Sequence, residues 1–170
     1  MPASPASGPA FGQIDMVETR ASARVVVTIN AFGARLGDNE AQIAATATRI
    51  TNLVEAWKAE ESARANAPPA PDRLFPAPPS GRDFLDQRNR RRAIVHHLHL
   101  YDALLQFRRD TINEFRSWVD SSTRDLNLVH IDTLLRAEDL ASEGERYLEE
   151  RVEARKGNAE WCSFLAAGLE

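Results

Sequence analysis

Cysteine is almost absent from this sequence, since Cys162 is the only one. A single cysteine cannot form a disulfide within the chain or supply the thiolates of a cysteine-rich metal site, and such usage favours a reducing, intracellular compartment. We expect the cytoplasm rather than the nucleus. The first ten residues lack the charged start and the apolar run of a secretory signal, and no apolar run approaches the ~18 residues of a membrane-spanning helix. The sequence therefore predicts neither a secretory signal nor a membrane span.

Catalytic signatures are also lacking. The chain contains no glycine-rich phosphate loop, no Gly-x-Ser-x-Gly and no His-Glu-x-x-His. Its many carboxylates lie in amphipathic segments, where most of them would face solvent. Cys162 stands beside Trp161 and is interpreted as a small packed residue rather than a nucleophile. We therefore expect a protein that is not an enzyme and that has no cofactor.

Aromatic residues are few, at 7% of the chain, although the hydrophobic total of 43% and the length of 170 residues suit one folded domain. Burial completed by other chains is one interpretation of this shortage. The net charge of −4 disfavours general binding to nucleic acid. Residues 81–120 carry eight basic and six acidic side chains, whereas residues 121–170 carry six and eleven. These two segments could attract one another, within a chain or between chains.

The most regular feature of the sequence is a heptad-spaced apolar row within one predicted central helix. The row has steps of three and four and comprises Ile94, Leu98, Tyr101, Leu105, Ile112, Phe115 and Val119. It is interrupted where Arg108 occupies an expected apolar position. A second row widens the apolar stripe beyond that of a two-stranded coiled coil, and comprises Leu100, Leu104, Phe107 and Trp118. The predicted core seam for helix packing or protein binding is Ile94, Leu98, Leu105, Ile112 and Phe115.

Composition and periodicity divide the chain into six segments. They are a disordered tail at 1–12, a long helix at 13–65, a proline-rich linker at 66–80, a central core helix at 81–120, an acidic amphipathic helix at 121–157 and a short apolar end at 158–170. Ser80 and Asp83 are spaced as in a capping box, so the central helix should begin near Asp83. The predicted fold is all-α: an elongated helical bundle, or an antiparallel coiled-coil hairpin with a third amphipathic helix.

Two features of the first helix leave alternatives open. Gly33 and Gly37 each cost about 1 kcal/mol of helix stability relative to alanine, and the sequence allows a break near Gly37, where Asp38 or Asn39 could cap a new helix. Residues 24–29 form a β-branched run that would also suit a strand. We favour a helix there, because no other stretch is comparably β-branched and a lone strand is not stable.

A histidine cluster follows the start of the central helix. His96 and His99 are three residues apart and would share nearly one helix face, whereas His97 would point elsewhere. Two imidazoles at this spacing could bind a metal or small ligand, but the sequence shows neither a second histidine-rich stretch nor a Glu-x-x-His motif to complete a site. We therefore expect no bound metal and keep a ligand-binding bundle as an alternative function.

The densest basic run comprises Arg88, Arg90, Arg91 and Arg92. Positive charge near a helix start is unfavourable because it opposes the helix dipole. A run of arginines at this place therefore suggests that the charge serves in binding. The favoured interpretation is pairing with the acidic C-terminal region of the same or a neighbouring chain. An adaptor guided to an acidic partner protein is the alternative, and nucleic acid is less favoured.

The end of the chain is unusually apolar for its length, with Trp161, Phe164 and Leu165 as its main side chains. Such a cluster either folds back onto the bundle or, if exposed, provides an outward contact for a partner. The functional hypothesis from the sequence is a structural or scaffolding subunit that forms homo- or hetero-oligomers with other protein chains through apolar helix faces.

Overall fold

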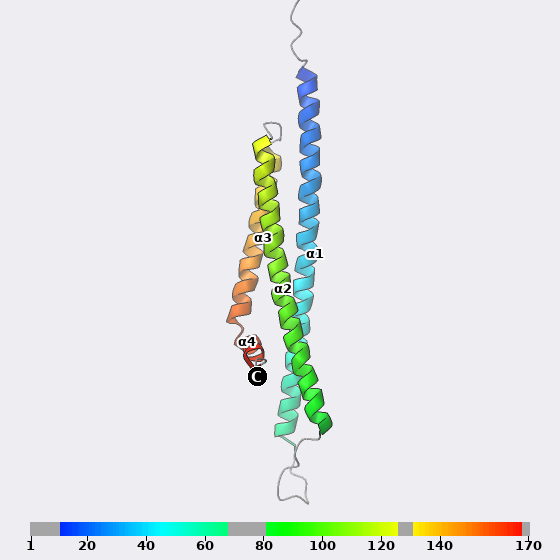
Figure 1. The fold of residues 1–170 in the computed structure, drawn as a ribbon, viewed down its shortest axis with the longest axis vertical. Coiled ribbons are helices and arrows are strands. Elements are labelled where there is room, and N and C mark those ends of the chain that lie inside the picture. Colours follow the sequence, from blue (N-terminus) through cyan, green and yellow to red (C-terminus); the bar gives the residue numbers. More distant parts are fainter. Residues whose placement is uncertain (1–10, 68–80, 126–130, 168–170) are drawn as a thin grey trace, which may run out of the picture. The chain divides into compact units, whose positions relative to one another are not determined.

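The computed structural model describes residues 11–67, 81–125 and 131–167, and over these ranges the chain is all-α with four helices and no strand. The helices are α1 (Phe11–Ala65), α2 (Gly81–Asp125), α3 (Ile131–Gly157) and α4 (Ala159–Ala166) (Figure 1). They pack against one another, which confirms the predicted all-α bundle.

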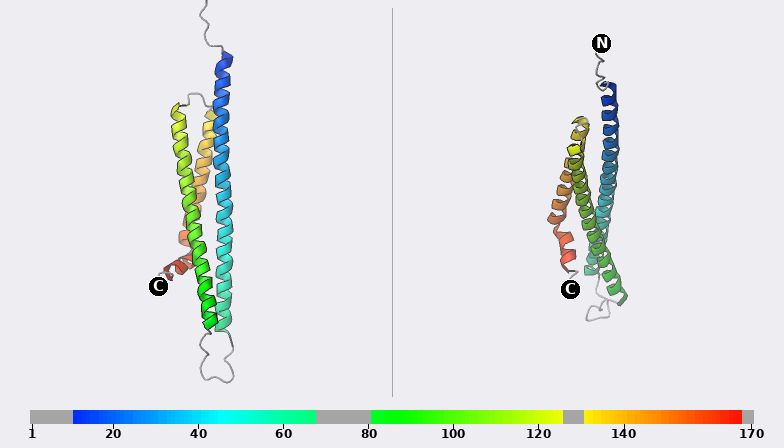
Figure 2. Two further views of the ribbon diagram at one scale, coloured as in Figure 1. Left: turned by 45° about the vertical axis from the view of Figure 1, so that its right-hand side comes forward. Right: turned by 45° about the horizontal axis from the view of Figure 1, so that its top comes forward.

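The chain divides into two compact units rather than one. Unit 1 combines residues up to Asn39 with Phe107–Glu149, and unit 2 combines Glu40–Gln106 with the residues from Glu150 onward. At about 1.5 Å per residue, a helix as long as α1 exceeds the diameter of a small domain, so one core cannot bury its whole length. In each unit α1 and α2 run in opposite directions, and in unit 1 α3 runs in the same direction as α1 (Figures 1 and 2).

α1 is continuous through both positions where the sequence allowed another structure. Residues 24–29 are helical, and within them Val25 and Ile29 are buried while Val27 is 68% exposed, as expected for one buried helix face. The break considered near Gly37 does not occur. Tertiary packing of the buried face stabilises a helix more than intrinsic propensity does, and this offsets the two glycines.

The other boundaries differ from those expected by a few residues. α2 continues to Asp125, past the serines expected near its end. Within this helix the Ser121 hydroxyl donates to the Ser117 carbonyl at 2.9 Å, so this side chain bonds inside the helix instead of ending it. Phe11 and Gly12 of the predicted tail belong to α1. Residues 1–10 of that tail, residues 68–80 of the predicted linker and residues 126–130 of the predicted third helix lie outside the described residues.

The core of unit 1 is an aromatic and small-residue cluster shared by three helices. It comprises Val25, Ile29 and Phe32 from α1, Phe115 and Val119 from α2, and Ala137 and Ala141 from α3, with Trp118 and Leu140 packed against it. The rings of Phe32 and Phe115 have centroids 4.7 Å apart, and Trp118 stacks on Phe115 at 5.9 Å. The two alanines allow α3 to lie close to these rings.

Arg108 lies in the interior of unit 1, where its side chain is 3% exposed. Its Nε donates to the Gly144 carbonyl of α3 at 3.2 Å, and its Nη1 donates to the Leu36 carbonyl of α1 at 3.0 Å and to Asn39 Oδ1 at 3.4 Å. The guanidinium also lies 4.3 Å from the centre of the Tyr147 ring. The residue that interrupts the heptad row thus joins α2 to both neighbouring helices.

Unit 2 is closed by buried rows on α1 and α2 and by α4. The buried side chains comprise Ile43, Ile50 and Val54 from α1 and Ile94, Leu98, Tyr101 and Leu105 from α2. α4 begins at an N-cap, where Asn158 Oδ1 accepts from the Trp161 amide at 3.0 Å. This cap turns the last apolar side chains back toward α1 and α2.

Candidate interaction surfaces

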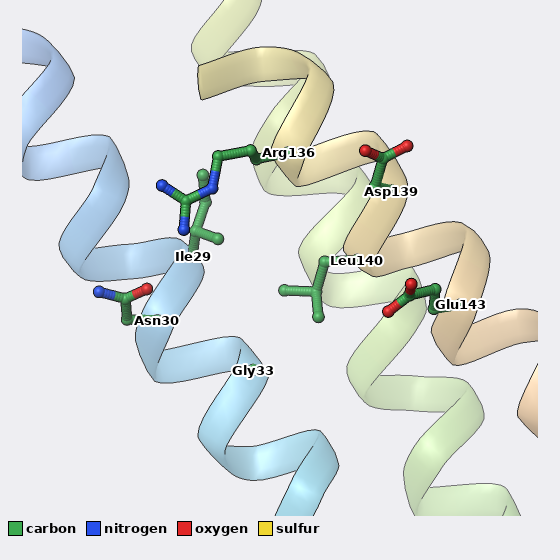
Figure 3. A pocket seen from close by; sticks show the side chains of 7 residues that line it. All are labelled: Ile29, Asn30, Gly33, Arg136, Asp139, Leu140 and Glu143. Atoms are coloured by element: carbon green, nitrogen blue, oxygen red, sulfur yellow. The ribbon is translucent and has the colours of Figure 1, made fainter. Parts of the chain in front are cut away.

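A shallow groove of about 370 Å³ lies between α1 and α3 in unit 1 (Figure 3). Ile29, Asn30 and Gly33 line it from α1, and Arg136, Asp139, Leu140 and Glu143 line it from α3. Ile29 is buried and Leu140 is half-buried, so the floor is apolar. A side chain at Gly33 would begin 3.9 Å from the Leu140 methyl groups, so the missing Cβ leaves the groove wider there.

The rim of this groove on α3 is charged. Arg136 extends from α3 toward α1, and the Glu143 side chain also points toward the groove (Figure 3). Arg136, Asp139 and Glu143 are exposed, and none of them forms an ion pair with another described residue. No lining residue is a histidine, cysteine or hydroxyl nucleophile. The groove therefore combines an apolar floor with a charged rim.

Several large apolar side chains are exposed on helix faces turned away from the cores. In unit 1, Ile131 (72%) and Leu135 (56%) are four residues apart on one face of α3, and Val27 (68%) is on α1. In unit 2, Phe84 (58%) and Leu85 (55%) are adjacent in the first turn of α2. Phe107 of unit 1 is 47% exposed, and the Arg35 guanidinium covers part of its ring at 5.9 Å.

The predicted seam residues are internal packing residues. Ile94, Leu98 and Leu105 are 0–6% exposed in unit 2, and Ile112 and Phe115 are 0–2% exposed in unit 1. All five are therefore buried within the chain itself, and their side chains are not exposed to a partner in this fold.

The apolar end of the chain also packs inward. Trp161 is 9% exposed and meets the Tyr101 ring edge-on at 5.4 Å, and Phe164 meets the Trp57 ring edge-on at 5.9 Å. Leu165 is half-buried. Of the two alternatives that the sequence left open for these three side chains, the structure therefore shows folding back onto the bundle, and not the outward contact.

Two ion pairs that the sequence did not indicate accompany this packing in unit 2. Arg155 binds both oxygens of Asp102, at 2.9 and 3.2 Å, and Lys58 Nζ lies 2.7 Å from Glu160 Oε1. The pKa of Lys58 is raised, mainly by its hydrogen bond to Glu160 and next by its hydrogen bond to Glu55. No sequence spacing could reveal these pairs, because their partners come from different helices.

Among the described residues of this chain, the arginine run has one ion-pair partner, and it lies on α1; pairing with the acidic region of a neighbouring chain stays a prediction. Arg90 forms an ion pair with Glu60 of α1, not with the acidic C-terminal region. Arg88 and Arg92 are exposed, and Arg91 is half-buried. The reason is topological, because the start of α2 lies beside the end of α1 within unit 2 (Figure 1).

The three neighbouring histidines have two different environments. His96 and His99 are exposed on α2, whereas His97 is half-buried, and its Nδ1 has no hydrogen-bond partner among the described residues. Burial lowers the pKa of His97, and the nearby His96 and Arg49 lower it further. Within the described ranges, no group of three or more histidine, cysteine, aspartate or glutamate side chains is arranged to bind a metal ion.

Comparison with protein-family models, curated proteins and solved structures finds no match to this chain. In the part of the chain that the structure describes, no helix is both long and apolar enough to cross a bilayer. Function must therefore be argued from the surfaces of the two units.

Proposed function

We propose that this protein is a structural or scaffolding subunit of a larger protein assembly and that it binds other chains through helix faces. The observation that carries the proposal is the exposure of Ile131 and Leu135 on one face of α3, in a unit whose own core is already closed by Phe32 and Phe115. An apolar pair on a helix surface gains free energy when a partner removes it from water, by about 25 cal/mol per Å² of apolar area.

The local chemistry supports binding rather than catalysis. The α1–α3 groove is open to solvent and combines an apolar floor with charged rims. Such a surface resembles the polar rim and apolar centre of protein interfaces. The charged side chains around it would fix the orientation of the bound chain, and the apolar floor would supply affinity.

The test is co-purification with the full chain as bait under native conditions. Replacing both Ile131→Ser and Leu135→Ser should reduce the amount of the bound chain at least tenfold, because two exposed apolar anchors are lost. The matched control is Val27→Ser, which removes a comparably exposed apolar side chain from α1 of the same unit. All variants should keep the helical circular dichroism of the original.

Two results would contradict the proposal. The first is that neither another protein nor a second copy of the chain binds at a fixed stoichiometry. The second is that the double variant and the control retain every bound chain equally well.

A second candidate is an adaptor that binds an anionic partner through the start of α2. Arg88, Arg92, His96 and His99 are all exposed and follow one another at steps of four, four and three, which places them on one helix face. Positive charge on this face disfavours a metal cation at the two histidines and favours an anion.

Binding of an acidic protein should fall steeply with salt and should be lost in Arg88→Glu/Arg92→Glu. Salt-independent binding would exclude this candidate.

A further inference from the structure

We propose that the α1–α3 groove of unit 1 is filled by α3 of a second copy of this chain, running antiparallel to the first about a twofold axis near Asp139 and Leu140. In this arrangement Arg136 of each copy faces Glu143 of the other, and Asp132 faces Arg146. The inference rests on the proposed function, because it names the partner that the groove binds.

Charged side chains of both signs form a row along α3. Asp132, Arg136, Asp139, Glu143 and Arg146 follow one another at steps of four, three, four and three, so they form one row along the helix, and all five are exposed. Arg136, Asp139 and Glu143 of this row line the groove.

This row is complementary to a second copy of itself only when that copy is reversed. In an antiparallel pair about a twofold axis, residues on either side of the axis exchange places. The midpoint between Asp132 and Arg146 is residue 139. The midpoint between Arg136 and Glu143 falls between residues 139 and 140, so one axis serves both pairs. Both pairs therefore bring opposite charges together, four contacts in all. A parallel pair in register would instead place each charge opposite its own copy.

The shape of the groove at that midpoint favours the same arrangement. Leu140 is half-buried and reaches into the groove (Figure 3), opposite Gly33 of α1, which has no Cβ. A helix that enters between α1 and α3 brings its own Leu140 to this place. The two leucines would then form the apolar centre of the interface, with the ion pairs at its rim.

The same geometry creates one unfavourable contact. Asp139 lies at the axis, so the carboxylates of the two copies approach each other. This conflict gives the proposal a signature that a merely structural role for α3 would not produce: removing the Asp139 charge should strengthen association, although the side chain is exposed and makes no ion pair with a described residue.

The experiment is sedimentation velocity on the full chain over a concentration series. The original chain should form a dimer. Arg136→Glu and Glu143→Arg should each raise the dissociation constant by about tenfold or more, because each turns two attractive contacts into repulsive ones. The combined variant Arg136→Glu/Glu143→Arg should restore the dimer, and Asp139→Asn should lower the dissociation constant.

The matched control is Arg92→Glu, an equal change of charge at an exposed position of α2 in unit 2, which should leave the dissociation constant unchanged. Circular dichroism on each variant separates dissociation from unfolding. A folded chain that stays monomeric at the highest concentration overturns the inference. The inference is also overturned if Arg136→Glu leaves the dissociation constant of the dimer unchanged, or if the combined variant does not dimerise.

These outcomes are distinguishable from failure of the proposed function. A monomer that still binds a different protein chain at a fixed stoichiometry through unit 1 would overturn the second copy as the occupant and would support the role as an assembly subunit. A monomer that binds no chain at all would overturn both.

Discussion

At the scale of single residues, Arg108 shows how a polar side chain can be accommodated in a helical core. Its donors reach the carbonyls of Leu36 and Gly144 and the amide oxygen of Asn39, and its flat face lies on Tyr147. Buried polar groups that keep their hydrogen bonds specify one arrangement of neighbouring helices. The sequence marked this residue as a break in an apolar row, but its acceptors could not be predicted, because they belong to other helices.

Arg108→Ala should lower the free energy of unfolding by about 3 kcal/mol, because it leaves a cavity and removes donors to buried acceptors. Arg108→Met, which fills most of the space, should lose less. Urea denaturation followed by circular dichroism measures both changes. Equal stability of the original chain and the alanine variant would show that these hydrogen bonds contribute nothing to folding.

His97 should make the protein less stable in acid. Burial, His96 and Arg49 lower its pKa in the folded chain below the ordinary value of 6.5, so the unfolded chain takes up the proton first as the pH falls. The contribution of His97 is fully present above about pH 6.5 and is lost as the pH falls from there through its folded-state pKa. His97→Gln should show a smaller decrease in urea midpoint between about pH 7.5 and about pH 5.5 than the original chain. An identical decrease would rule out His97 as a source.

At the scale of elements, what the sequence predicted well was local. Heptad spacing identified α2 and its buried face, from Ile94 to Val119, because helix periodicity depends only on neighbouring residues. The ion pair of Arg90 with Glu60 was not predictable, because it depends on the register between two helices. The groove between α1 and α3 was missed for the same reason, although the row of acidic and basic side chains from Asp132 to Arg146 was a signal for it in the sequence.

Two glycines in helices of unit 1 should respond oppositely to substitution. Gly37 has nothing within 4 Å of an added Cβ, so Gly37→Ala should raise the free energy of unfolding by about 1 kcal/mol. At Gly144 an added Cβ would lie 3.3 Å from buried Ile112 and 3.4 Å from Leu36. Gly144→Ala should therefore lower stability by about 1 kcal/mol through overpacking. Thermal and urea unfolding test the pair, and a gain of stability at Gly144 equal to that at Gly37 would contradict this packing.

At the scale of the whole chain, each unit joins segments that are far apart in the sequence, and α1, α2 and α3 each contribute to both units. The predicted seam residues are buried, and the exposed surfaces include the α1–α3 groove, the apolar side chains on α3 and α2 and the basic face of α2. Aromatic residues are few in the sequence, and in the core of unit 1 the rings pack beside small residues, Ala137 and Ala141. This arrangement supports a role in assembly, where helix faces serve as binding surfaces.

The molar mass of the protein under native conditions shows whether the chain works as a subunit bound to other chains. Light scattering coupled to size exclusion on the purified full chain, together with everything that co-purifies with it, gives this mass. We expect a helical complex of fixed stoichiometry, with at least two chains. A folded single chain with no bound protein at every concentration measured would contradict it.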